Sequence, residues 1–115
     1  PKPSQADIQR LTKAAVQDYV NTDLAAVINN ARASGDVNKL GIAYVRAGRY
    51  SEAKAEFSKG ANAGNISAIN NLANIYMIEK NYSGAAAQYR RVLQIAPDNK
   101  TALKGLDSAN SKLAD

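Results

Sequence analysis

The sequence nearly repeats itself over two consecutive stretches, and this constrains the fold more than any other feature. Leu40 and Leu72 stand 32 residues apart, and the same separation relates the residues that follow them. Repeats of roughly 20–50 residues are typical of units that cannot bury an apolar face alone and must stack into a solenoid. The side chains that recur in this register are Leu40, Gly41, Tyr44, Ala53 and Phe57 in the first stretch and Leu72, Ala73, Tyr76, Ala85 and Tyr89 in the second.

Between the turn signals, the chain has the spacing of amphipathic helices. Apolar residues fall three or four apart, and strand patterns are nearly absent. Because short connections make neighbouring helices antiparallel, we predict an all-α chain of about seven helices. Its first helix begins near Ser4 and breaks at Asn21–Thr22–Asp23. The later boundaries are set by Gly35 with a cap from Asp36, by Gly48 with a cap from Ser51, by Gly64 and Asn65, by Asn81 to Ser83, and by Pro97.

Composition excludes several kinds of chemistry. With no cysteine and no histidine, the chain has no thiol chemistry, no zinc site of the usual ligand types and no histidine acid–base catalysis. Glu52 and Glu56 share a helix face, but with Lys59 nearby they are typical of an ordinary charged surface. The sequence has no Gly-rich phosphate loop and no nucleophile elbow. We therefore expect a chain that is not an enzyme and that needs no cofactor or metal.

The chain is basic, with a net charge of +5, but its basic residues are scattered. A nucleic-acid binder would normally gather them on one face or interleave them with aromatic residues, so we expect solvated helix faces and no nucleic-acid partner. No apolar run approaches the roughly 20 residues that span a bilayer, and we expect a soluble chain. The sequence begins with Pro1 and not with methionine, which favours a processed protein or a piece of a larger cytoplasmic or exported one; the compartment stays open.

The recurring positions resemble the tetratricopeptide repeat, a helix–turn–helix unit of about 34 residues with small residues where paired helices approach and aromatic residues between them. The resemblance covers about residues 34–114. The tryptophan position of the pattern is unfilled, and the end of the first full repeat, from Ala61 through Gly64 and Ala68, is similar to Sel1-like repeats.

The resemblance implies a right-handed α-solenoid of antiparallel helix pairs in a single domain. Weaker echoes at a spacing of 29, from Leu11 and Ile28 to Leu40 and Phe57, suggest a degenerate first repeat. The expected units are a degenerate N-terminal helical hairpin over 1–33, repeats over 34–65 and 66–99, and a capping helix over 100–115.

The resemblance also implies a place for a ligand, because in this family the first helix of each pair lines a concave groove. The expected partner-binding residues are Asn38, Ile42, Val45, Asn70, Asn71, Asn74, Met77, Lys104 and Ser108, with Ser111 on the same face and Lys39, Arg46 and Lys112 beside it. A row of asparagines beside lysines suits an extended, possibly acidic, peptide, because amides pair with main-chain groups and lysine attracts carboxylates. Asn71 and Lys104 are similar to two members of the family's carboxylate clamp, but Ile42 stands where the clamp has an asparagine.

The sequence therefore predicts a non-catalytic protein-interaction module or scaffold that binds an extended peptide or a partner helix. Two alternatives stay open: a helical-repeat binder of RNA or another polyanion, and self-association through Leu103, Leu106 and Leu113 of the last helix. Asn65, Asn81 and Asn99 each fit the glycosylation acceptor pattern, but each lies at a predicted turn, where asparagine is expected for backbone reasons.

Overall fold

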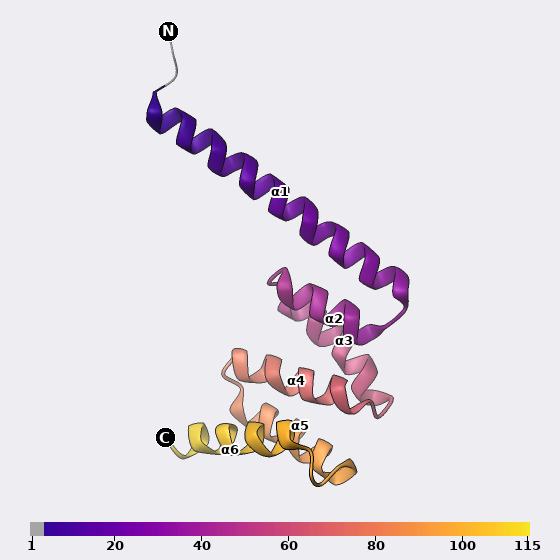
Figure 1. Ribbon diagram of the computed structural model, residues 1–115. Coiled ribbons are helices and arrows are strands. Elements are labelled where there is room, and N and C mark those ends of the chain that lie inside the picture. The colour runs from indigo at the N-terminus through magenta and orange to yellow at the C-terminus, as the bar shows by residue number, and fades with distance from the viewer. Residues whose placement is uncertain (1–3) are drawn as a thin grey trace.

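The computed structural model describes residues 4–115, which form six helices and no strand (Figure 1). The chain is thus all-α, as predicted, and neighbouring helices pack in sequence order. The helices are α1 (Gln5–Ser34), α2 (Val37–Arg46), α3 (Tyr50–Asn62), α4 (Ile66–Ile78), α5 (Tyr82–Ile95) and α6 (Lys100–Ala114).

Side chains at the predicted turns cap the N-termini of four of these helices. Asp36 accepts hydrogen bonds from two main-chain N–H groups in the first turn of α2, and Asn65, Asn81 and Asn99 do the same for one N–H each in α4, α5 and α6. These asparagines therefore have the backbone role that the sequence favours. The expected cap at Ser51 is wrong: α3 begins at Tyr50, which places Ser51 inside the first turn, and Arg49 supplies no capping side chain.

The largest departure from prediction lies at the N-terminus. Residues 5–34 form one continuous helix, so the expected break at Asn21–Thr22–Asp23 is absent and the hairpin predicted over 1–33 is wrong. Each of these three residues lowers helix propensity by only about 0.5–0.7 kcal/mol relative to alanine, and no glycine or proline lies between Gln5 and Ser34. Without such a breaker the helix continues. Its predicted stripe at Leu11, Ala15 and Tyr19 lies outside the side chains that the structure describes.

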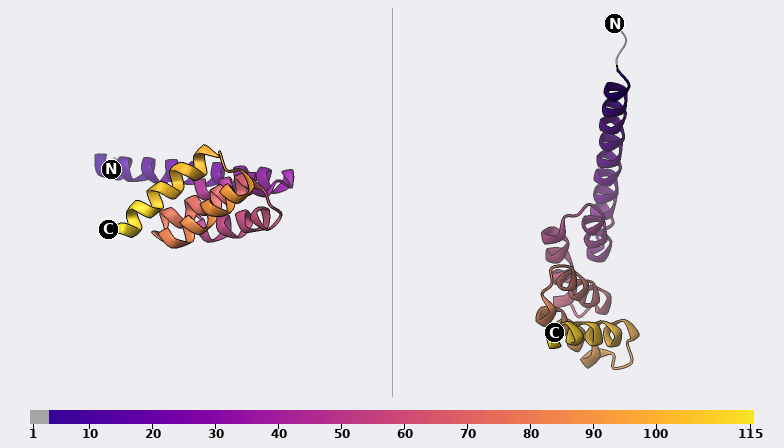
Figure 2. Two further views of the ribbon diagram at one scale, coloured as in Figure 1. Left: turned by 90° about the horizontal axis from the view of Figure 1, so that it is seen from below. Right: turned by 90° about the vertical axis from the view of Figure 1, so that its left-hand side faces the viewer.

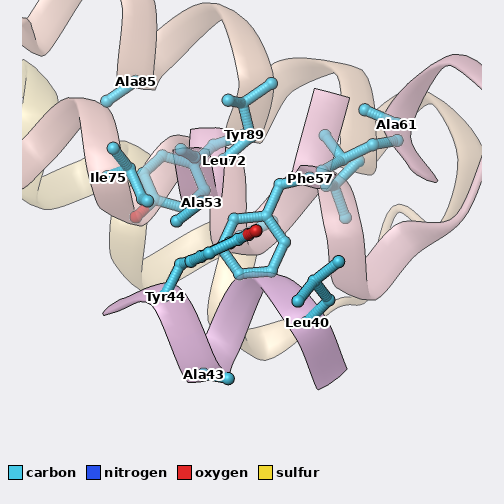
Figure 3. Close-up of a cluster of buried hydrophobic side chains, with 14 of the residues drawn as sticks. Leu40, Ala43, Tyr44, Ala53, Phe57, Ala61, Leu72, Ile75, Ala85 and Tyr89 are labelled. Atoms are coloured by element: carbon cyan, nitrogen blue, oxygen red, sulfur yellow. The ribbon is translucent and has the colours of Figure 1, made fainter. Parts of the chain in front are cut away.

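The helices approach closely because glycine faces an aromatic ring at two crossings. A methyl group on Gly41 in α2 would lie 2.4 Å from the ring of Phe57 in α3, and one on Gly105 in α6 would lie 2.3 Å from the ring of Tyr89 in α5. Ala53, Ala73 and Ala85, at the predicted small positions, are fully buried. Figure 3 shows Phe57 and Tyr44 between the helices of the first pair. The close packing of the stacked helices therefore depends on this alternation of large and small residues.

The molecule is elongated. Its radius of gyration is 18.9 Å, against about 13 Å for a compact domain of this length. The N-terminal part of α1 accounts for this shape, because it extends away from the stack of α2–α6 as a single rod (Figure 2). Among the described helices, α1 contacts only α2. It does so through its C-terminal part, where Ile28 and Ala31 are buried.

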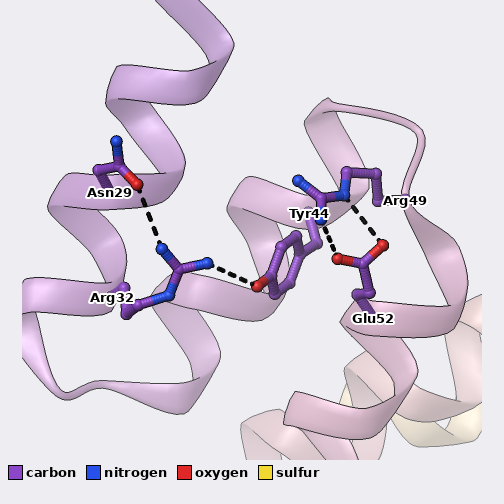
Figure 4. A network of polar contacts seen from close by, with 5 residues as sticks. All are labelled: Asn29, Arg32, Tyr44, Arg49 and Glu52. Carbon is purple, nitrogen blue, oxygen red and sulfur yellow. Dashed lines mark hydrogen bonds and ion pairs between the residues drawn. The ribbon is translucent and has the colours of Figure 1, made fainter.

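Tyr44 connects the first three helices (Figure 4). Its hydroxyl accepts a hydrogen bond of 3.0 Å from Arg32 of α1, and Arg32 also donates to Asn29. The guanidinium of Arg49 lies 5.0 Å from the centre of the Tyr44 ring. Arg49 in turn pairs with Glu52 of α3, and this hydrogen bond raises the pKa of Arg49. One aromatic side chain of α2 thus anchors the end of α1 on one side and the start of α3 on the other.

The glycine at the first crossing generates a stability prediction. Gly41→Ala should lower the free energy of unfolding by about 1–3 kcal/mol, because the added methyl meets the Phe57 ring and overpacks the crossing. Denaturant unfolding monitored by circular dichroism measures this. A second change, Phe57→Leu, should recover part of the loss in the Gly41→Ala background, although alone it destabilises. A neutral or stabilising Gly41→Ala would show that the close approach is not needed.

Candidate binding groove

A polar hollow lies where α2, α4 and α6 meet. Its volume is about 410 Å³ and it is open to solvent. Amides, hydroxyls and one aliphatic side chain surround it, and none of its lining residues is charged. The lining residues are Asn38, Ile42, Ser67, Asn70, Asn71, Asn74 and Thr101.

A second, more apolar hollow of about 170 Å³ continues the first along α2 and α4. Ile42, Asn71 and Asn74 line both hollows, so the two form one groove with a polar half and an apolar half. We call this the inner groove. Ile42 and Ile78 are 41% and 53% exposed, although both are large aliphatic side chains. The residues that line the apolar half are Ile42, Val45, Arg46, Phe57, Asn71, Asn74, Ile75 and Ile78.

A third hollow lies beside the inner groove, between α2 and the C-terminal part of α1. It has a volume of about 450 Å³, and we call it the α1/α2 hollow. Ile42 and Arg46 line it as well as the inner groove, so α2 presents side chains to both. Its lining residues are Val27, Asn30, Ala31, Ser34, Lys39, Ile42, Ala43 and Arg46.

The structure brings most of the predicted partner-binding residues together. Asn38, Ile42, Asn70, Asn71 and Asn74 line the polar half of the inner groove, and Val45 lines the apolar half. The remaining three do not line it. Met77 is half-buried and packs against the core, whereas Lys104 and Ser108 lie exposed on α6. The groove therefore reaches α6 at its first turn, through Thr101.

Two of the asparagines have a structural task that sequence reasoning missed. The Asn38 Nδ2 donates to the Oδ1 of Asn65 at 3.1 Å, and the Asn70 Nδ2 donates to the Oδ1 of Asn99 at 3.3 Å. Both acceptors are helix N-caps, and each also binds a main-chain N–H of its own helix. The Oδ1 atoms of Asn38 and Asn70 are buried without a partner. These two side chains therefore hold the starts of α4 and α6, and their oxygens do not reach the surface of the groove.

The amides that remain available are those of Asn71 and Asn74. The Oδ1 of Asn74 accepts a hydrogen bond of 2.5 Å from the hydroxyl of Tyr89, which leaves its Nδ2 as a free donor. Asn71 is half-exposed and its side chain makes no hydrogen bond to the described residues. Burial raises the pKa of Tyr89, so the phenol stays protonated and keeps donating to Asn74. The inner groove thus offers at least one acceptor, the Oδ1 of Asn71, and four N–H donors from these two amides.

Charge around the grooves is positive and uncompensated. Lys39 and Arg46 make no side-chain hydrogen bond or ion pair with the described residues. No carboxylate lines the inner groove or the α1/α2 hollow. Other basic residues are neutralised elsewhere, in the pairs Arg49–Glu52, Lys54–Glu79 and Lys59–Glu56. The grooves therefore favour a ligand that carries negative charge beside Lys39 and Arg46.

Several lining residues were not expected from sequence. Ser67 and Ile78 each lie four residues from Asn71 or Asn74 on α4, Ile75 lies four from Asn71, and Thr101 lies three from Lys104 on α6. The three-or-four spacing along α4 and α6 is the signal that could have identified them. Val27, Asn30 and Ser34 line the α1/α2 hollow. Because α1 continues past the predicted break, its N-terminal part does not fold back over them. Within residues 4–115, no helix is long and apolar enough to cross a membrane, and no three carboxylates cluster as metal ligands would.

Comparison with known protein families identifies a match for the C-terminal half of the chain. The family model described as "E3 ubiquitin-protein ligase SHPRH, first helical domain" matches residues 50–109, a little over half of the chain. The matched segment runs from the start of α3 into α6, and it includes α4 with its groove-lining face. No curated protein matches the chain.

The link between Asn38 and Asn65 generates a stability prediction with a matched control. Asn65→Ala removes the cap of α4 and the bond from Asn38, and should lower the free energy of unfolding by about 2 kcal/mol. Asn81→Ala removes the cap of α5 and a local 3.4 Å hydrogen bond from the exposed Ser83 hydroxyl, but no link between helices, and should cost about 1 kcal/mol. Urea denaturation of both variants measures the difference. Equal losses would mean that the link between the helices contributes nothing.

The buried phenol generates a pH prediction. Because folding raises the pKa of Tyr89 above its ordinary value of about 10, its stability contribution is complete below pH 10 and is lost as pH rises through the folded-state pKa. Tyr89→Phe should therefore lose less of its thermal stability between pH 9 and pH 11 than the unaltered chain. Melting temperatures across that range test this, with Tyr82→Phe as the control. Parallel alkaline decline in all three proteins would contradict it.

Proposed function

The chain belongs to the family of the first helical domain of the E3 ubiquitin-protein ligase SHPRH, and we propose that it is a non-catalytic protein-interaction module that holds an extended peptide in the inner groove. By its description, SHPRH is an E3 ubiquitin-protein ligase, and the matched part is one helical domain of it. In this chain, the groove residues are suited to recognition: aliphatic side chains, free amides and unpaired cations. The resemblance to tetratricopeptide repeats supports the same role.

The observation that carries this proposal is the pair of exposed isoleucines in the apolar half. Ile42 from α2 and Ile78 from α4 line one hollow, and both remain largely open to water. A ligand side chain placed between them would remove apolar surface from water on three sides, which is favourable at about 25 cal/mol per Å². Both side chains project from rigid helices, so little order has to be gained on binding.

The amides beside the isoleucines favour an extended ligand. An extended chain exposes an N–H or C=O group on each side about every 3.3 Å, and none of these groups is satisfied within the ligand itself. Asn71 and Asn74 are three residues apart on α4, so they lie on the same helix face with both amides toward the groove. Their donors and acceptors can pair with the ligand's main chain without regard to its sequence, while the isoleucines select an apolar side chain.

Lys39 and Arg46 add a preference for acidic ligands. Arg46 lines the apolar half of the inner groove, whereas Lys39 lines the adjoining α1/α2 hollow. The two stand seven residues apart on α2, about 10.5 Å along the helix axis, with Ile42 between them. A carboxylate on either side of the bound apolar residue would come near one of these cations. Such an exposed pair contributes little affinity but speeds association and orients the ligand.

The test uses peptides selected by display on the purified chain, synthesised with a fluorophore and titrated by anisotropy. Ile42→Asp should weaken binding of the selected peptides at least tenfold, because it puts a charge where an apolar side chain packs. Asn71→Ala should weaken it about fivefold. Ile95→Asp is the control, since Ile95 is 51% exposed on α5 and lines neither half of the inner groove.

Circular dichroism melting accompanies each variant, and neither groove change should shift the transition by more than a few degrees. Equal affinity of Ile42→Asp and the unaltered chain would remove the proposal. A salt titration with single-stranded RNA separates the alternative: affinity for RNA that falls steeply with salt and exceeds that for the peptides would identify a polyanion binder.

A further inference from the structure

The stack shows a regular contact that one helix lacks. The first helices of successive pairs touch each other, since α2 contacts α4 and α4 contacts α6. On its other side, α2 has no such neighbour among the described helices. The α1/α2 hollow occupies this side and exposes Ile42, Lys39 and Arg46. Because the stack repeats, the α1/α2 hollow is where the first helix of a preceding pair would lie.

The sequence contains a segment with the register of that missing helix. Leu11 corresponds to Leu40 at a spacing of 29, as Ile28 corresponds to Phe57. Residues 5–20 are therefore the counterpart of α2, and the C-terminal part of α1 is the counterpart of α3. Yet α1 is continuous, so residues 5–20 extend away from the stack (Figures 1 and 2). Only the C-terminal part of α1 lines the hollow.

We propose that residues 5–20 of a second copy of the chain occupy the α1/α2 hollow, and that two copies exchange these segments about a two-fold axis. A chain that filled its own hollow would have to break α1 and give up main-chain hydrogen bonds near residues 21–23. The exchange keeps α1 intact, because the neighbour's segment arrives as a straight helix. It also gives a closed, self-complementary interface, which is the commonest form of oligomer.

The geometry of two straight helices supports this arrangement. If two antiparallel α1 helices cross near residue 19, residue 11 of one copy lies beside residue 27 of the other, and residue 8 lies beside residue 30. Val27 and Asn30 are lining residues of the hollow. The positions Ile8, Leu11, Ala15 and Tyr19 are spaced three or four apart, which is the spacing of an apolar stripe on a helix.

The segment is neutral overall, with Asp7 and Asp18 near its two ends and Arg10 and Lys13 between them, and the hollow carries Lys39 and Arg46 and no carboxylate. Asp7 and Asp18 are the groups of the segment that can pair with those two cations. Ile42 lines the hollow as well as the inner groove, so a helix seated in the hollow covers one side of this aliphatic side chain and leaves the other side to the inner groove. The occupant that these features fit is therefore the chain's own N-terminal segment, supplied by another molecule.

The absence of native cysteines allows a direct test with the double variant Leu11→Cys, Ile42→Cys. In one straight molecule, residue 11 lies about 24 Å along α1 from residue 27 in the hollow, so the two thiols cannot meet within one chain. Exchange predicts a disulfide between chains after mild oxidation, seen as a covalent dimer on a non-reducing gel. Light scattering of the unaltered chain should give twice the chain mass of 12.2 kDa at high concentration.

Leu11→Cys, Ile95→Cys serves as the control, because Ile95 is equally exposed but lies at the end of α5, away from the hollow. It should give no specific dimer. A disulfide within one chain would show that the segment folds back on its own molecule and would overturn the proposal. So would a scattering mass of one chain at every concentration, or covalent dimer formed equally by the control.

Discussion

The close approach of paired helices depends on one kind of contact, a side-chain ring against a glycine or alanine. Phe57 lies against Gly41, and Tyr89 lies against Gly105, at distances that leave no room for a methyl group. The rings are almost fully buried, so they cannot move aside without opening a void. These contacts set how near α2 lies to α3 and α5 to α6, and hence where α2, α4 and α6 stand relative to one another. The inner groove is the space that this arrangement leaves on one side of the stack.

The repeat made this arrangement predictable, because it placed large and small residues in a register that only stacked helix pairs satisfy. Most helix boundaries were also predictable, since Asp36, Asn65 and Asn99 cap helices through local hydrogen bonds that involve only their own neighbourhood. The continuity of α1 through residues 21–23 was not predictable. Weak helix formers such as Asn21 and Thr22 end a helix only when tertiary contacts favour a break, and local sequence does not show whether such contacts exist. Here the chain's own contacts do not supply them, and α1 continues.

The site was predictable in part for the same reason. Spacing along a helix identified the face of α2 and α4 that lines the groove, but not which side chains on that face are free. Asn38 and Asn71 are alike in sequence, yet Asn38 is committed to the cap of α4 and Asn71 is open. This distinction depends on contacts between residues 27 or more apart, which no local pattern encodes. Thr101 and Ile78 were missed although they continue the same spacing on α6 and α4.

The hydrogen bonds from Asn38 to Asn65 and from Asn70 to Asn99 run along the stack in one row. Each joins the N-terminal half of one first helix to the N-cap of the next, so the helices that line the inner groove are linked at these ends. Whatever steadies α2 lowers the tendency of the first turn of α4 to fray, and the same holds from α4 to α6. By reciprocity, loosening of the first turn of α6 weakens the hydrogen bond that Asn70 of α4 makes to Asn99. A ligand that steadies α2 therefore acts on the first turn of α4 as well, and through Asn70 on that of α6.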